Sequence, residues 1–378
     1  MIHLIFIGAI ISIGLALTLR WTGITSLVPL LRPSSITHVS FPSTSLQGAR
    51  FWTVFIYIIA ASISRRLSIS GRRSPWRITE NDASEATYRL DGPTVSLSMP
   101  FRIRRGDIDK YARAVTANQA TITHEEILRP PHLHLLLSAL TEPAMLLLLS
   151  TRTCPIDPVG TVNVRNRFEL TRPLACAQRL KDCLRNAGDG GGDLSIIARL
   201  DQDVKKVKRG WEYRVIVDLL DEKGEDPVLY RQIFTILQFH KHSCSTSIFE
   251  TEVSDTPKSL LEVGKLHLTA NDPKSWASFS KDYNPIHLST LAAKLFGFSS
   301  IIAHGNHVAA KAVHHFSLSD RLEDDKQQEE SWMEVEFKRP TFLPCELKIQ
   351  RVDGQSSSVV QLQIGKGDKI NLSMKFAH

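Results

Sequence analysis

Cysteine is scarce in this sequence, and no two cysteines stand at a spacing that binds metal. Five cysteines are spread over 378 residues, with no C-x-x-C pair among them. An odd number of scattered thiols supplies neither a disulfide framework nor the close ligands of a structural zinc site. We therefore expect reduced, mostly structural cysteines.

Acidic residues are absent from the first 79 positions, whereas eight arginines fall there. The same region holds two apolar runs, at 2–19 and 51–64. The first run is about as long as a bilayer-spanning helix, and the arginines after the second would hold the rest of the chain on the cytosolic or matrix side. We expect residues 1–92 to anchor the chain to a membrane, with a mitochondrial targeting segment as the alternative.

The remainder of the chain has the composition of a folded globular protein. The whole sequence is 42% hydrophobic and 22% charged, and its excess of +7 is explained by the arginine-rich start. Beyond residue 80 the charges nearly balance, so no basic surface for nucleic acid is indicated.

One pattern occurs twice after residue 93. In each half an amphipathic segment (109–119 or 273–285) is followed by an apolar helix and then by runs that alternate with period 2, which is typical of antiparallel strands. This order predicts an α+β fold in which each sheet wraps a long helix. The helices are predicted within 133–149 and 305–313, and the strands at 160–173, 194–200, 211–219, 228–239, 331–340, 345–351, 359–364 and 369–376.

The two halves suggest a division into domains. We assign residues 93–238 to the first domain, 239–254 to a linker and 255–378 to the second domain. The leucine run at 135–149 is interrupted by Thr141, Glu142 and Pro143, so it is predicted to be a buried core helix rather than a bilayer span.

The second half contains S-K-D-Y-N-P-I-H at 280–287. Pro285 disfavours helix at Asn284, which puts Asp282 at a helix end and His287 just past a turn. A carboxylate and an imidazole that meet at such a corner can hydrogen-bond one water and act as an acid/base pair near neutral pH.

A second phrase, A-H-G at 303–305, stands at the start of the apolar helix. The N–H of Gly305 is therefore expected among the unpaired donors of a helix N-terminus, where it would stabilise negative charge that develops on an oxygen. Glycine also lets a ligand approach the backbone closely.

Together, S-K-D-Y-N-P-I-H-L-S and F-G-F-S-S-I-I-A-H-G resemble the hydratase-2 motif of the MaoC-like family, and residues 93–378 resemble its two-domain (3R)-hydroxyacyl-thioester dehydratases. The resemblance implies a double hot-dog fold and hydration of trans-2-enoyl thioesters, or the reverse dehydration, on coenzyme A or an acyl carrier protein. It implies that Asp282 and His287 are the catalytic pair, that Gly305 is the oxyanion donor, and that the reaction needs no metal or redox cofactor. A homodimer is a further expectation.

Three neighbouring residues complete the comparison with the motif. Asn284 and His304 are expected beside the substrate, with Asn284 also bracing the loop and His304 alternatively only part of the helix entry. Lys281 stands where the family commonly has glycine, and its ammonium could lower the pKa of Asp282.

The first half is predicted to lack this chemistry. Aligning the two repeats places Ala117 opposite Asp282 and Ile122 opposite His287, so we expect the first domain to hold the acyl chain and the second to carry the reaction. The other interpretations are a hot-dog thioesterase and a non-catalytic acyl-binding protein at a membrane. The acid and imidazole at 282 and 287 argue against both.

Overall fold

The structure is a computed structural model. It describes residues 38–40, 76–82, 87–92, 94–116, 122–151, 153–158, 161–185, 194–224, 227–239, 259–319, 330–353 and 359–377. The two apolar runs of the N-terminal region and nearly all of the predicted linker lie outside these residues.

The first half is built around helix α6 (His132–Ser150), which is apolar on all sides. Such a helix is stable only when other elements cover it on all sides. Of its most apolar 18-residue stretch, 94% is buried. Its length and composition would also suit a membrane span, but α6 is the core helix that the sequence predicted. The strands that wrap it are β4 (Ser96–Pro100), β5 (Thr161–Leu170), β6 (Leu194–Val207), β7 (Gly210–Asp221) and β8 (Val228–Phe239).

The second half repeats this plan around helix α11 (Gly305–Ser319). Its buried residues include Val308, Ala312 and Phe316, which recur at helical spacing. The strands are β9 (Leu260–Leu268), β10 (Ser331–Phe337), β11 (Cys345–Val352), β12 (Val359–Lys366) and β13 (Lys369–Ala377). In strands such as β10, buried and partly exposed residues alternate, as one covered face requires.

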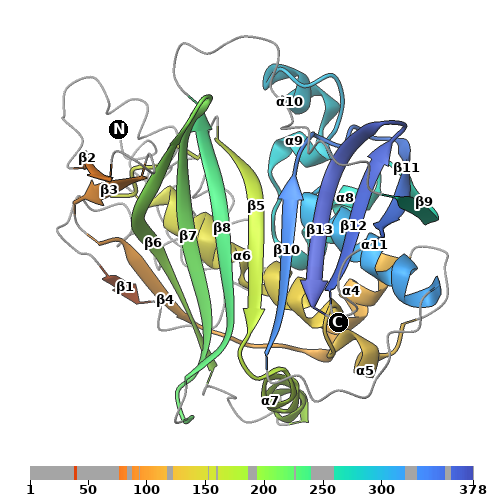
Figure 1. The fold of residues 1–378 in the computed structure, drawn as a ribbon. Coiled ribbons are helices and arrows are strands. Elements are labelled where there is room, and N and C mark those ends of the chain that lie inside the picture. The colour runs from red at the N-terminus through yellow and green to blue at the C-terminus, as the bar shows by residue number, and fades with distance from the viewer. Residues whose placement is uncertain are drawn as a thin grey trace, which may run out of the picture.

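The two sheets are joined edge to edge. Strand β5 pairs antiparallel with β10, from Leu170 opposite Ser331 to Arg165 opposite Glu336. The result is one sheet of 13 strands, whose main order is β1-β4-β6-β7-β8-β5-β10-β13-β12-β11-β9. Figure 1 shows this sheet in front of α6 and α11. The fold is therefore the predicted double hot dog, with its two sheets fused into one.

The remaining elements lie at the edges and on the helix side. They are β1 (His38–Ser40), β2 (Arg77–Asp82), β3 (Thr87–Asp91), α4 (Arg105–Thr116), α5 (His124–Ile127), α7 (Pro173–Arg185), α8 (Asp272–Ser280), α9 (Pro285–Leu288) and α10 (Thr290–Leu295). Sequence analysis did not predict β4, β9 or α7. Strand β9 has mostly exposed or half-buried residues and so shows little alternation in hydrophobicity.

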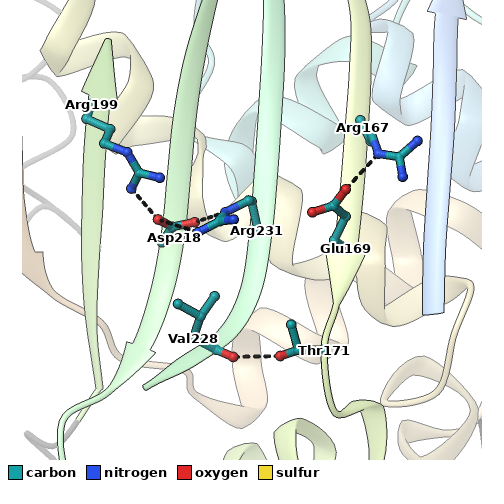
Figure 2. Close-up of polar contacts among 7 residues, drawn as sticks. All are labelled: Arg167, Glu169, Thr171, Arg199, Asp218, Val228 and Arg231. Carbon is teal, nitrogen blue, oxygen red and sulfur yellow. Dashed lines mark hydrogen bonds and ion pairs between the residues drawn. The ribbon is translucent and has the colours of Figure 1, made fainter. Parts of the chain in front are cut away.

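Charged side chains fasten the strands of the first half to one another. Asp218 on β7 is nearly buried and forms ion pairs with Arg199 on β6 and with Arg231 on β8, the latter at 2.7 Å (Figure 2). The pairing raises the pKa of Arg231. A buried carboxylate needs such partners because an unpaired charge is costly away from water.

Candidate active site

The loop with the predicted acid begins at Lys281, which ends helix α8 in the left-handed conformation. Its φ is 62° and its ψ is 13°, and among the described residues it is the one non-glycine with positive φ. Glycine adopts this conformation without the Cβ clash of other residues, which gives a physical reason for glycine at this place in the related motif. The Lys281 ammonium donates to the Ser278 carbonyl at 2.6 Å.

Two side chains fold the backbone between Lys281 and His287 into a tight corner. Asp282 Oδ1 accepts from the N–H of Asn284 at 3.1 Å, and Asn284 Oδ1 accepts from the N–H of Ile286 at 3.4 Å. Pro285 then occupies the first position of helix α9, where its missing N–H costs no hydrogen bond. His287 is thereby turned back toward Asp282.

Asp282 and His287 face each other as two acceptors. His287 Nδ1 lies 2.7 Å from the carbonyl oxygen of Ile302. Because a carbonyl only accepts, Nδ1 carries the hydrogen and Nε2 is left with its lone pair in the neutral ring. Nε2 lies 3.9 Å from Asp282 Oδ2, and 13% and 14% of the two side chains is exposed. A single water could donate to both atoms.

His304 fastens the start of α11 to this corner. Its Nε2 lies 3.0 Å from the backbone oxygen of Asp282, so Nε2 carries the hydrogen and donates it. Its ring stacks on that of His287, with ring centres 3.9 Å apart. Burial, reinforced by His287, lowers the pKa of His304 well below its ordinary value and keeps the ring neutral. Its Nδ1 is buried and has no hydrogen-bond partner within the part of the chain that the structure describes.

Gly305 is the first residue of α11, so its N–H has no partner within the helix and lies at the positive end of the helix dipole. Here glycine is required by a close approach. A Cβ on Gly305 would stand 2.3 Å from Cε1 of Phe337 on β10. The aromatic ring therefore fixes where the helix begins.

The structure brings four of the predicted site residues together and leaves the fifth, Asn284, exposed at the side. Asp282, His287, His304 and Gly305 meet where the α8–α9 loop touches the start of α11. Asn284 is exposed and caps α9, which is the bracing role predicted for it.

The same groups include three with the spacing of a metal site. One donor atom each of Asp282, His287 and His304 lies within 4.8 Å of the others. His304 could offer Nε2 to a metal only by giving up its hydrogen bond to the Asp282 carbonyl. The tautomers that these hydrogen bonds require therefore suit a proton-transfer pair better than a ligand set.

At the corresponding corner of the first half, the position of His287 is not occupied by an imidazole. Helix α5 has its N-cap at Thr123, as α9 has at Asn284, so counting from the caps puts Glu126, rather than Ile122, opposite His287. The Glu126 carboxylate accepts from the Thr123 N–H at 2.7 Å in a capping box, which lowers its pKa. Ala117 lies outside the described residues.

Sequence analysis overlooked Glu142 as a candidate site residue. It was noted only as an interruption of the leucine run, yet its side chain is buried in the core of the first half and interacts electrostatically with Asp282. The sequence could have identified Glu142, since it is a single acidic residue in an apolar helix. Burying such a residue is costly, and buried acidic groups are frequent at functional sites.

Comparison with known proteins agrees with this architecture. Residues 253–361 match the family model described as MaoC like domain. Over 218 residues, 57% of this chain and 68% of the relative, the sequence is 26% identical to 3-hydroxyacyl-thioester dehydratase X of Mycobacterium tuberculosis.

Two solved structures share the fold. The crystal structure of HtdX of Mycobacterium tuberculosis has a TM-score of 0.50 at 21% identity and covers 75% of this chain and 98% of that chain. A MaoC-like dehydratase from Phytophthora capsici has a TM-score of 0.53 at 14% identity and covers 79% and 97%. At such identities the likeness shows the double hot-dog architecture.

The family model defines the class of the protein as a dehydratase, which is a hydro-lyase. More particularly, residues 253–361 are a MaoC-like domain.

The left-handed conformation of Lys281 leads to a prediction about stability. Lys281→Gly should raise the free energy of unfolding by about 0.5–1 kcal/mol, because glycine relieves the Cβ clash but loses more chain entropy. Lys281→Ala is the matched control, since it removes the ammonium but keeps the clash, and should give no gain. Urea denaturation of the three proteins measures the difference. Equal gains in both variants would show that the side chain, and not the backbone, causes the strain.

Proposed function

We propose that the enzyme hydrates trans-2-enoyl thioesters to (3R)-3-hydroxyacyl thioesters and catalyses the reverse dehydration. The observation that carries the proposal is the pair of acceptors at Asp282 Oδ2 and His287 Nε2, 3.9 Å apart. Two acceptors at this distance have no hydrogen bond to share, but both can accept from one water. The printed name of the mycobacterial relative, a 3-hydroxyacyl-thioester dehydratase, supports the substrate class.

The reaction follows from this placement. As the water oxygen bonds to C3 of the enoyl group, the pair takes one of the water protons, and negative charge moves to the thioester oxygen. A proton is then returned to C2, so that the hydroxyl on C3 and the hydrogen on C2 together amount to one water. The Ile302 carbonyl holds the His287 ring in the tautomer that can accept the proton.

The N–H of Gly305 supplies a donor for the thioester oxygen. Its position at the start of α11 adds the helix dipole to the hydrogen bond, and such donors act where charge develops rather than on the ground state. The carrier would be coenzyme A or an acyl carrier protein. The pair offers water from one side only, which supports a single enantiomer, and the likeness to the hydratase-2 motif supports (3R).

Loss of the conjugated enoyl absorbance tests the activity over a series of enoyl-CoA chain lengths, with chiral analysis of the product. Asp282→Asn and His287→Ala should each lower kcat/KM by about 10²–10⁴-fold, because each removes a proton carrier. Asp109→Asn is a matched control, since Asp109 contacts His124 at 2.8 Å in an exposed acid–imidazole pair of the first half, and should keep full activity. Undiminished hydration in both site variants, or release of free thiol in place of hydration, would refute the assignment.

Gly305→Ala should lower kcat/KM by about 10²-fold, because the new methyl group would meet the Phe337 ring and displace the donor N–H. Gly106→Ala is the control, since a Cβ there would meet nothing within 4 Å. The same hydration assay reports both, and circular dichroism checks that both variants fold. Wild-type rates in the Gly305→Ala variant would remove this glycine from the mechanism.

We also propose that residues 1–92 hold the enzyme at a membrane, with the catalytic part on the cytosolic or matrix side. The support is the two apolar runs and the arginines among them. A fluorescent protein fused after residue 92 should sediment with membranes and resist extraction by carbonate, whereas residues 93–378 should not. Recovery of the fusion as a cleaved protein in the mitochondrial matrix would instead establish a targeting segment.

A further inference from the structure

Glu142 is a buried carboxyl group, and one of its oxygens has no hydrogen-bond partner among the described residues. It is the one acidic residue of α6, 8% of it is exposed, and its Oε2 is buried with no hydrogen bond. A buried carboxyl without a donor or a countercharge is stable only in its neutral form. Burial, with Asp282 as the second cause, raises the pKa of Glu142 well above its ordinary value. The group therefore keeps its proton and is a hydrogen-bond donor.

The part of α6 next to Glu142 contacts the second half of the chain. Ser138 lies one turn earlier on the same face of the helix, and residues four apart are neighbours on a helix surface. Ser138 Oγ accepts from Asn306 Nδ2 at 3.1 Å, and Asn306 directly follows Gly305. Ser138 thus contacts the residue after the oxyanion donor, and Glu142, one turn further along α6, is close enough to Asp282 to feel its charge.

Other polar groups nearby are already engaged. Tyr230 on β8 interacts with Glu142, but burial raises its pKa well above the ordinary value. Its single hydroxyl hydrogen has two acceptors within the core, Gln232 Oε1 at 3.1 Å and the His134 carbonyl at 3.2 Å. On α11, Lys311 pairs with Asp272 on α8 at 2.8 Å, and His307 donates to the Ala114 carbonyl of α4 at 2.7 Å. Asp282 is then the nearby acidic group whose electrostatic influence Glu142 feels.

We propose that Glu142 is a further catalytic residue, contributed by the first half, whose neutral carboxyl donates a hydrogen bond to the thioester oxygen beside the N–H of Gly305. The inference rests on the function proposed above. Glu142 transfers no proton and stays protonated through the cycle. A carboxylic acid held neutral by an apolar site is an effective oxyanion donor, because its hydrogen bond strengthens as the oxygen becomes negative.

Steady-state hydration of crotonyl-CoA from pH 6 to 10 by the full chain tests the role. Glu142→Gln keeps a donor of the same shape and should retain kcat within about threefold at pH 7, whereas Glu142→Leu, which has no donor, should lose about 10²-fold in kcat. Wild-type activity should fall on the alkaline side as Glu142 ionises, and this fall should be weaker in Glu142→Gln. Glu125→Gln, an exposed acid on α5, is the matched control and should behave as wild type.

Three outcomes would overturn the proposal: wild-type kcat in Glu142→Leu, a Glu142→Gln variant as impaired as Glu142→Leu, or an unchanged alkaline fall in Glu142→Gln. If Glu142→Leu does not fold, the Glu142→Gln profile decides alone. A wild-type protein that hydrates no enoyl thioester refutes the proposed function instead, and is thus distinguishable.

A melting curve against pH gives a readout that does not depend on activity. The pKa of Glu142 is raised in the folded state, and its ordinary value is near 4.5. As the pH rises above 4.5, Glu142 therefore ionises only in the unfolded chain. Ionisation stabilises the unfolded chain, so the free energy of unfolding falls until the pH reaches the raised pKa. The Tm of Glu142→Gln minus the Tm of wild type should therefore increase from pH 4.5 to pH 7. A constant Tm difference over that window would show that Glu142 is not held neutral.

Discussion

The pairing of β5 with β10 is the contact on which the rest of the molecule depends. Ladder hydrogen bonds between these two strands fuse the sheets of the two halves, and the fusion brings α6 and α11 together behind one continuous surface. Where they meet, buried polar groups bridge the halves: Asn166 on β5 donates to Asn306, and Asn306 donates to Ser138 on α6. Each needs its partner because an unpaired buried amide is costly. The start of α11, and with it Gly305, is thereby fixed from the first half.

Around this seam the site is assembled from neutral imidazoles whose hydrogens are fixed by backbone carbonyls. His287 donates to Ile302 and His304 donates to Asp282, so each ring has one orientation and one tautomer. The lone pair of His287 Nε2 can then face only the Asp282 carboxylate. Burial keeps His304 uncharged, which spares the stacked pair the repulsion of two imidazolium rings. The spacing between the acceptor atoms of Asp282 and His287 is therefore a consequence of backbone geometry.

Prediction from the sequence succeeded where the pattern is local. Period-2 runs located the strands β6, β7, β8 and β13, because one buried face forces alternation. The Asn-Pro corner correctly set Asp282 and His287 on either side of a turn, because proline and an Asx turn constrain the backbone whatever surrounds them. Strand β9 was not predicted because its side chains are largely exposed. Helix α7 was not predicted because it buries only Pro173, Cys176 and Leu180 and so lacks the long apolar run of α6.

What the sequence by itself determined is the repeated helix-and-strand plan and the acid, imidazole and glycine that fit its second copy. Only the tertiary structure decided that Lys281 takes a conformation suited to glycine, that Phe337 leaves no room for a side chain at position 305, and that Glu142 interacts with Asp282. The reason is distance along the chain: Glu142 and Asp282 lie 140 residues apart in the sequence. No local preference encodes their meeting, which arises only when two sheets pair and their helices are packed side by side.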